Sequence, residues 1–198
     1  MVQAILDGRK TMTRRVMQLQ PTSPATIFDV ASGLPVWAIW PSEELDDAGH
    51  PKDHGIKCPY GRPGDRLWVR EAWGTIPGCN AQSPSQLSKS HTIYYHADDG
   101  NNPVSRWRPS IHMPRWASRI TLEITAVRVE RLQAISDHDA FAEGLQSYVD
   151  THRGHTGGDG SARYTFAAMW DKINGKSRPW KSNPCVWVVE FRKAVCGG

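Results

Sequence analysis

The strongest constraint on the fold is a long alternation of polar and apolar residues over 118–130. An extended chain places successive side chains on opposite faces, so this pattern predicts a strand with one buried face, long enough to cross a small barrel. A nearly continuous apolar run over 184–191 predicts a buried closing strand. Residues 66–73 also alternate, and 92–97 have strand composition. We therefore expect strands to dominate the fold.

Short helices are expected between these strands. Apolar residues at helical spacing over 2–6 predict a first helix, followed by a sharply basic turn over 8–15. Ser136 has the sequence context of a helix N-cap, and one apolar face over 166–173 predicts a further packed helix. Strands interleaved with short helices favour an α+β fold over a doubly wound sheet.

The chain length favours one domain with long loops. The chain has 198 residues, enough for one substantial core but short for two domains. Segments rich in Pro, Ser, Asp and Gly predict loop insertions at about 18–57, 74–90 and 146–161. Within the first of these, residues 36–40 are apolar enough to form a strand or one arm of a hairpin.

Composition restricts the partners and the chemistry. The 24 Lys and Arg against 20 Asp and Glu give a net charge of +4, which suits a polyanionic partner without requiring one. Nine Trp can fill a core or stack on bases. The four Cys are scattered without metal-ligand spacing, so we expect free thiols, no metal and no cofactor. Without an apolar run of about 20 residues or a signal peptide, we expect a cytoplasmic protein with no membrane partner.

Four motifs in order resemble the ASCH family, in its phage or prophage form. These motifs are residues 5–15, Pro-Gly-Asp at 63–65, Ala-Phe-Ala-Glu-Gly at 140–144, and the closing run 186–191. The resemblance covers nearly the whole chain and implies a small mixed β-barrel of the PUA-like type with short flanking helices. It also implies a cleft beside the first helix that takes RNA or a modified nucleoside. The family usually opens with a strand before this helix, so a truncated start would leave the barrel one strand short.

The resemblance implies a catalytic set. The smallest bacterial members are amidohydrolases that remove the acetyl group from N4-acetylcytidine with a Lys, a Thr three residues later and a distant Glu. Lys10, Thr13 and Glu143 occupy the matching positions. An amine, a hydroxyl and a carboxyl can serve as base, nucleophile and acid for amide hydrolysis. The base must be neutral, so the pKa of Lys10 must fall, as burial and the neighbouring Arg9, Arg14 and Arg15 would cause.

Further residues are expected to contact the substrate. Arg15 would orient or polarise it, a cleft-facing Trp could stack on a pyrimidine, and residues 106–116 interleave basic and aromatic side chains as single-strand grooves do. The expected substrate-binding set is Arg9, Arg15, Trp68, Arg70, Glu71, Trp73, His112 and Arg115.

Other interpretations of the same residues remain open at this point. Lys10 and the arginines could form an exposed phosphate-binding turn, with Thr13 an ordinary strand residue and Glu143 an ordinary helix carboxylate. The tryptophans could simply fill the core. The chain could then be an RNA-binding module on single-stranded RNA without catalysis, or a ribonuclease that uses Lys10 and Glu143 at a 2′-hydroxyl.

Overall fold

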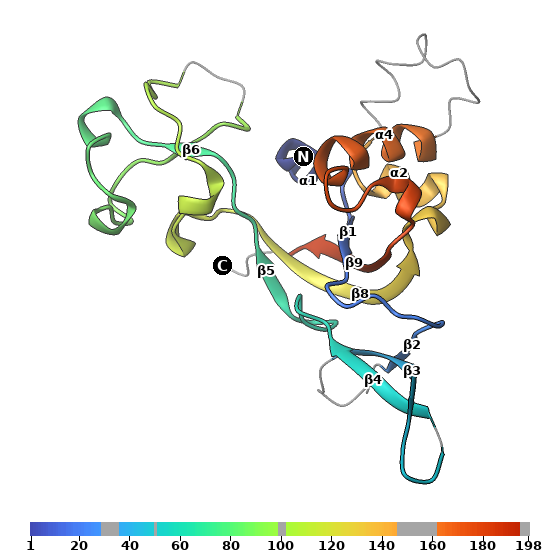
Figure 1. The fold of residues 1–198 in the computed structure, drawn as a ribbon. Helices are drawn as coiled ribbons and strands as arrows, with labels where there is room; N and C mark the ends of the chain where they lie inside the picture. The colour runs from blue at the N-terminus through green and yellow to red at the C-terminus, as the bar shows by residue number, and fades with distance from the viewer. Residues whose placement is uncertain (29–35, 50, 99–101, 146–161, 195–198) are drawn as a thin grey trace.

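A computed structural model describes residues 1–28, 36–49, 51–98, 102–145 and 162–194 of the chain (Figure 1). The fold is mixed α+β and is dominated by strands, as predicted. A curled antiparallel sheet forms its centre, in the order β1–β9–β8–β5. Its strands are β1 Met12–Val16, β5 Arg66–Trp68, β8 Thr121–Arg131 and β9 Cys185–Lys193.

The two strands predicted most directly from sequence lie side by side in this sheet. β8 and β9 pair over their whole lengths, with a register shift between Ile124 and Ala126. β9 is buried on both faces, because Val186 and Val188 pack on the helices while Cys185 and Trp187 pack on the opposite side. This double burial explains why its sequence is continuously apolar rather than alternating.

The segment 18–57, predicted as a loop, instead contains a second sheet. Its antiparallel strands are β2 Thr26–Phe28, β3 Trp37–Leu45 and β4 Pro51–Lys57. Ala38 and Trp40 face the core beside Trp187, whereas Trp37 on the other face is exposed. The loop prediction was wrong for β2 and β4, whose sequences supply little apolar surface, whereas the strand or hairpin arm expected at 36–40 lies largely in β3.

The helices are α1 Val2–Leu6, α2 Asp137–Ala142 and α4 Ala162–Asn174 (Figure 1). α2 and α4 cover the face of the central sheet that carries Val186 and Val188, whereas α1 packs against Phe191 near the end of β9. Ser136 caps α2 as predicted, because its hydroxyl accepts a hydrogen bond from the amide of Asp139 at 3.1 Å. Short 3-10 turns complete the described chain at Pro77–Cys79, Pro84–Gln86, Ser110–His112, Arg115–Ala117, Leu132–Ala134 and Trp180–Ser182.

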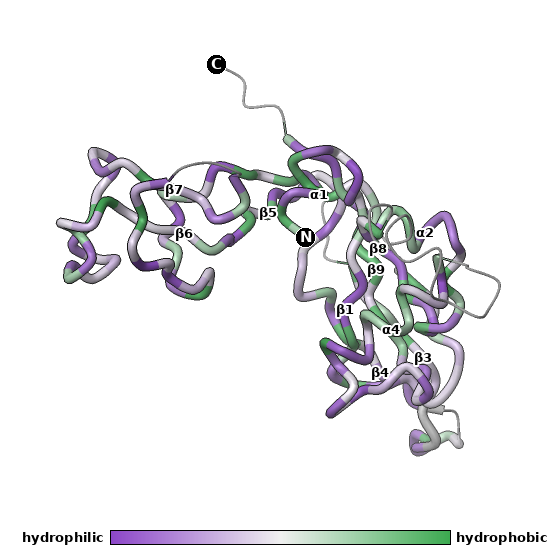
Figure 2. The backbone as a smooth tube through the Cα atoms, turned by 90° about the horizontal axis from the view of Figure 1, so that it is seen from above, coloured by the Kyte–Doolittle hydropathy of each residue, from purple (hydrophilic) through white to green (hydrophobic). Residues whose placement is uncertain are grey.

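Between β5 and β8 the chain leaves the central sheet and forms a lobe, defined here as residues 70–119 (Figure 2). The lobe contains the two-residue strands β6 Trp73–Gly74 and β7 Tyr94–Tyr95. The strands predicted over 66–73 and 92–97 are therefore much shorter than expected. The lobe has a small core of its own, made by Trp73, Leu87, Met113 and Ala117.

Residues 74–90 are mostly irregular, as expected, whereas the third expected insertion, 146–161, lies outside the described residues. Cys58, Cys79 and Cys185 are free thiols, and Cys196 lies outside the described residues. Within the described ranges, no helix has both the length and the apolarity needed to cross a membrane.

Candidate active site

Lys10 and Glu143, which are far apart in the sequence, meet at a short bridge between the start of the chain and α2. Lys10 lies between α1 and β1, and Glu143 caps the C-terminal end of α2. Gly144 turns the chain with φ of +92°, and a Cβ there would lie only 3.1 Å from the Cβ of Lys10. A residue without a side chain is therefore needed for the two segments to approach this closely.

The two side chains form a buried ion pair. The Lys10 ammonium donates to the Glu143 carboxylate at 2.6 Å, to the Met12 carbonyl at 2.7 Å and to the Glu143 carbonyl at 3.1 Å. The side chains are only 5% and 4% exposed. All three ammonium hydrogens can thus be used, which is what a buried charged amine requires.

Burial lowers the pKa of Lys10 below its usual range. The opposite charge of Glu143 resists this change, while the positive charges of Arg15 and Arg14 add to it. Burial and nearby cations are the two effects through which proteins lower the pKa of a catalytic lysine.

Arg14, expected from sequence only as a cation near Lys10, is a buried member of this site. Its fully buried guanidinium lies 2.6 Å from the carboxylate of Asp139, 3.1 Å from that of Glu130 and 3.7 Å from that of Glu143. Arg128 also bonds Asp139 and Glu130, which extends the network toward Glu190 on β9. The Glu143 oxygen nearest Arg14, Oε1, accepts no hydrogen bond from the described residues.

A signal for Arg14 was present in the sequence. Side chains alternate along β1, and the buried Met12 and Arg14 point toward α2 and α4. A charged residue at an inward position of a strand needs buried partners, and it therefore marks a buried ionic network.

Thr13 and Arg15 occupy the opposite face of β1. Thr13 pairs with Val189 and Arg15 pairs with Trp187 across the ladder to β9. Lys10 donates hydrogen bonds to Glu143 and to main-chain carbonyls, but none to the half-buried Thr13 among the described residues. The structure thus brings together two of the three expected catalytic residues and leaves the third on the opposite face of β1.

The expected substrate-binding residues do not gather in one place. Arg9 is paired with Asp7 at 2.8 Å beside α1. Trp68 lies under two guanidinium groups, with Arg70 at 5.0 Å and Arg115 at 5.6 Å from the centre of its ring. Arg70 and Arg115 make these cation–π contacts and have no carboxylate partner among the described residues.

Two other members of the expected set are buried in the lobe rather than facing a cleft. Trp73 is 0% exposed and fills the core of the lobe, under the guanidinium of Arg108 at 5.1 Å. Glu71 is 2% exposed and accepts two 3.0 Å hydrogen bonds from Arg119. Both therefore stabilise the lobe, and for Trp73 this agrees with the core-packing interpretation of the tryptophans.

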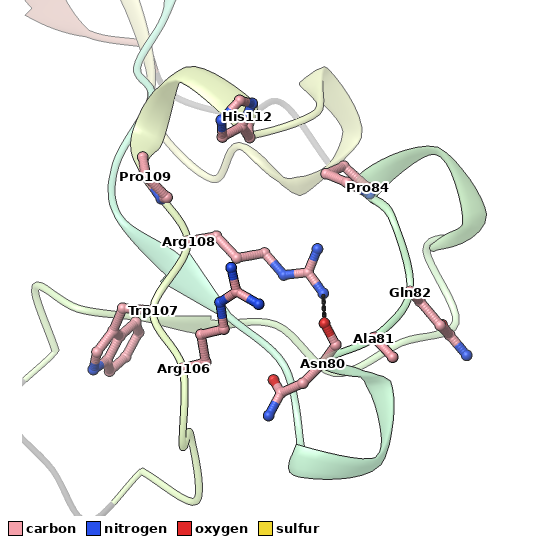
Figure 3. Close-up of a pocket in the computed structure, with 9 residues that line it drawn as sticks. All are labelled: Asn80, Ala81, Gln82, Pro84, Arg106, Trp107, Arg108, Pro109 and His112. Atoms are coloured by element: carbon pink, nitrogen blue, oxygen red, sulfur yellow. Dashed lines mark hydrogen bonds between the residues drawn. The ribbon is translucent and has the colours of Figure 1, made fainter.

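A cavity of about 450 Å³ opens on the lobe (Figure 3). Figure 3 shows the side chains of Arg106 and Arg108 turned toward Asn80. The Arg108 guanidinium donates to the carbonyls of Cys79 at 3.0 Å and Asn80 at 3.4 Å. The lining is completed by Ala81, Gln82, Pro84, Trp107, Pro109 and His112, the last of which was in the expected substrate-binding set.

Comparisons with known proteins do not extend the resemblance. No family model matches this sequence, and neither the curated proteins nor the solved structures contain a match. The described residues also contain no cluster of three or more His, Cys, Asp or Glu side chains placed to hold a metal ion.

Proposed function

We propose that this chain is an ASCH-type protein with a PUA-like barrel and that it hydrolyses the acyl amide of an N4-acylated cytidine. The single observation that carries the proposal is the buried pair formed by Lys10 and Glu143, with a 2.6 Å hydrogen bond between them. These are two of the three residues that the resemblance implies, and 133 positions separate them in the sequence. A surface lysine and an ordinary helix carboxylate would not require this enclosure.

The pair can supply both proton-transfer groups of an amide hydrolysis. One proton moving along the hydrogen bond converts an ammonium and a carboxylate into a neutral amine and a carboxylic acid. Burial of Lys10 and the cations Arg14 and Arg15 favour loss of its proton, whereas Arg14, which lies 3.7 Å from Glu143, opposes transfer of that proton to the carboxylate. Base and acid are then generated together, in the states that the reaction needs.

The proposed reaction begins at the hydroxyl of Thr13. Neutral Lys10 takes the hydroxyl proton, and the oxygen attacks the acyl carbon to form a tetrahedral intermediate. The bond from that carbon to N4 then breaks while protonated Glu143 gives its proton to the departing amine. Water afterwards releases the acyl group from Thr13. Because Thr13 lies on the opposite face of β1, the proposed reaction requires Lys10 to reach its hydroxyl when substrate binds.

The test is release of cytidine from N4-acetylcytidine, followed by liquid chromatography. We expect Lys10→Met and Glu143→Gln to abolish release, and Thr13→Val to abolish it if the hydroxyl is the nucleophile. Lys172→Met is the matched control, since Lys172 is an exposed lysine of α4. Absence of cytidine with the unmodified protein, or an unchanged rate in Lys10→Met, would refute the proposal. Cleavage of a labelled RNA under the same conditions would support the ribonuclease alternative instead.

A further inference from the structure

The lobe concentrates positive charge that its own carboxylates do not neutralise. Residues 70–119 contain six Lys and Arg against three Asp and Glu. Two of these acids, Glu71 and Asp98, are both bound by one residue, Arg119. Four other arginines have no ion pair within the described part of the lobe: Arg70, Arg106, Arg108 and Arg115. Such an excess suits an anionic partner.

The cavity on the lobe offers two kinds of recognition at once. Arg108 is held by two carbonyls and by the face of Trp73, so its guanidinium is fixed before any ligand arrives. Arg106 lies beside it and makes no hydrogen bond or ion pair with a described residue. The side-chain oxygens of Asn80 and Gln82 are buried and accept no hydrogen bond from a described residue. The cavity therefore presents cationic donors for an anion, and rotation of the Asn80 or Gln82 amide into it would add acceptors for N–H groups.

The charged surface continues from the cavity to Trp68. His112 lines the cavity, and the adjacent carbonyl of Ile111 accepts a 3.4 Å hydrogen bond from Arg70. The guanidinium groups of Arg70 and Arg115 in turn lie on Trp68. Arginines and aromatic rings thus alternate along one connected stretch of surface. A single strand of nucleic acid, with its regularly spaced phosphates and bases, requires this arrangement.

We propose that the lobe binds single-stranded nucleic acid, with one nucleotide in the cavity and the adjoining strand passing toward Trp68. Arg106 and Arg108 contact phosphate, while Asn80 and Gln82 accept hydrogen bonds from the amino or imino groups of the base. The cavity volume of about 450 Å³ lies within the range of small-ligand sites. An acidic peptide would satisfy the arginines, but it would make no use of the half-buried rings of Trp68 and Trp107 along the path. This proposal is independent of the hydrolysis proposed above.

The test is fluorescence anisotropy with labelled ten-residue oligonucleotides of mixed sequence, as RNA and as DNA, in 50 mM and 200 mM salt. We expect binding that weakens steeply with salt, because phosphate contacts release counterions. Arg106→Gln should reduce affinity about tenfold and should flatten the salt dependence by about one phosphate contact. Gln82→Met should reduce affinity severalfold without changing the salt dependence, since it removes an acceptor and no charge.

Lys89→Gln is the matched control, because it removes the same charge from an exposed position of the lobe that does not line the cavity. It should change affinity by less than twofold. Equal losses in Arg106→Gln and Lys89→Gln would overturn the proposal, as would equally tight binding of a ten-residue polyglutamate or no binding of either oligonucleotide in 50 mM salt. Selective binding of RNA or of DNA would each support it and would identify the natural strand. The oligonucleotides carry no acyl group, so the result does not depend on hydrolysis.

Discussion

Replacing Glu143 by Gln tests how much the protein depends on the buried pair. The substitution leaves the ammonium of Lys10 with two main-chain carbonyls but no opposite charge, in a site where its side chain is 5% exposed. It also removes the carboxylate that lies 3.7 Å from Arg14. Removing one partner of a buried ion pair typically costs about 3–5 kcal/mol, because the remaining charge is uncompensated.

The expected loss is large enough to measure by two methods. For a chain of this length, about 3–5 kcal/mol corresponds to a fall in Tm of roughly 6–20 °C. Urea unfolding followed by tryptophan fluorescence should give the same difference in the free energy of unfolding. The matched control is Glu123→Gln, which breaks a 2.7 Å pair with Arg192, whose side chain is 68% exposed. Exposed pairs contribute about 1 kcal/mol at most, so this control should change stability little.

The pH dependence of the loss provides a further check. Glu143 opposes the lowering of the Lys10 pKa, so without it that pKa falls further. A lysine with a lowered pKa in the folded state holds fewer protons than it does in the unfolded state. Stability therefore rises with pH up to the ordinary value of 10.5. The deficit of Glu143→Gln should shrink over that window. Equal losses in Glu143→Gln and Glu123→Gln at neutral pH would refute the reasoning.

Three further predictions follow from the same structure. Activity on N4-acetylcytidine should fall as pH rises through the lowered pKa of Lys10, because the pair then loses the one proton that Glu143 gives to the amine, and Arg15→Gln should move that fall to higher pH in a kcat/KM profile, since Arg15 contributes to the lowering. Gly144→Ala should destabilise the protein by about 1–3 kcal/mol in urea unfolding and should impair hydrolysis, because φ is +92° and the new Cβ would crowd Lys10. Trp187→Ala should lower the free energy of unfolding by about 3–5 kcal/mol and Trp37→Ala by much less, since Trp187 is 1% and Trp37 39% exposed. Similar Tm values for the two variants would contradict this.

The parts of the fold that were predicted from sequence are those in which a local pattern and the tertiary environment agree. The alternation in β8 and the apolar run of β9 were sufficient, because these strands form the middle of the central sheet. Ser136 was identified as a helix cap, since capping depends on residues within one turn. The same local sequences would form a strand or a helix cap in many different folds.

The parts that were missed depend on contacts between distant segments. β4 is recognisable as a strand only once β3 provides its ladder, since its own sequence carries little apolar alternation. The strand expected over 66–73 ends at Trp68, because the β8 ladder ends there and the chain enters the lobe. Trp73 was expected in a cleft, but a tryptophan's sequence context does not distinguish a stacking platform from a core residue.

The candidate site was predictable only in part. The resemblance identified Lys10 and Glu143, whose proximity no local pattern could indicate. It did not identify Arg14, although strict alternation along β1 would have placed that charge inside the protein. The cavity on the lobe required the structure, because its lining comes from two segments, 80–84 and 106–112, that the fold brings together.

The position of the lobe between β5 and β8 has a consequence for how the protein could be divided. These strands are antiparallel neighbours, and the amide of Val69 still donates to the carbonyl of Ile120 at 3.0 Å, where the lobe starts and finishes. A tight two-residue turn can close such a pair of strands. The fifty residues of the lobe thus occupy the place of a hairpin turn. The chain enters and leaves the lobe at two adjacent positions, so the lobe can be exchanged, shortened or extended without altering the central sheet.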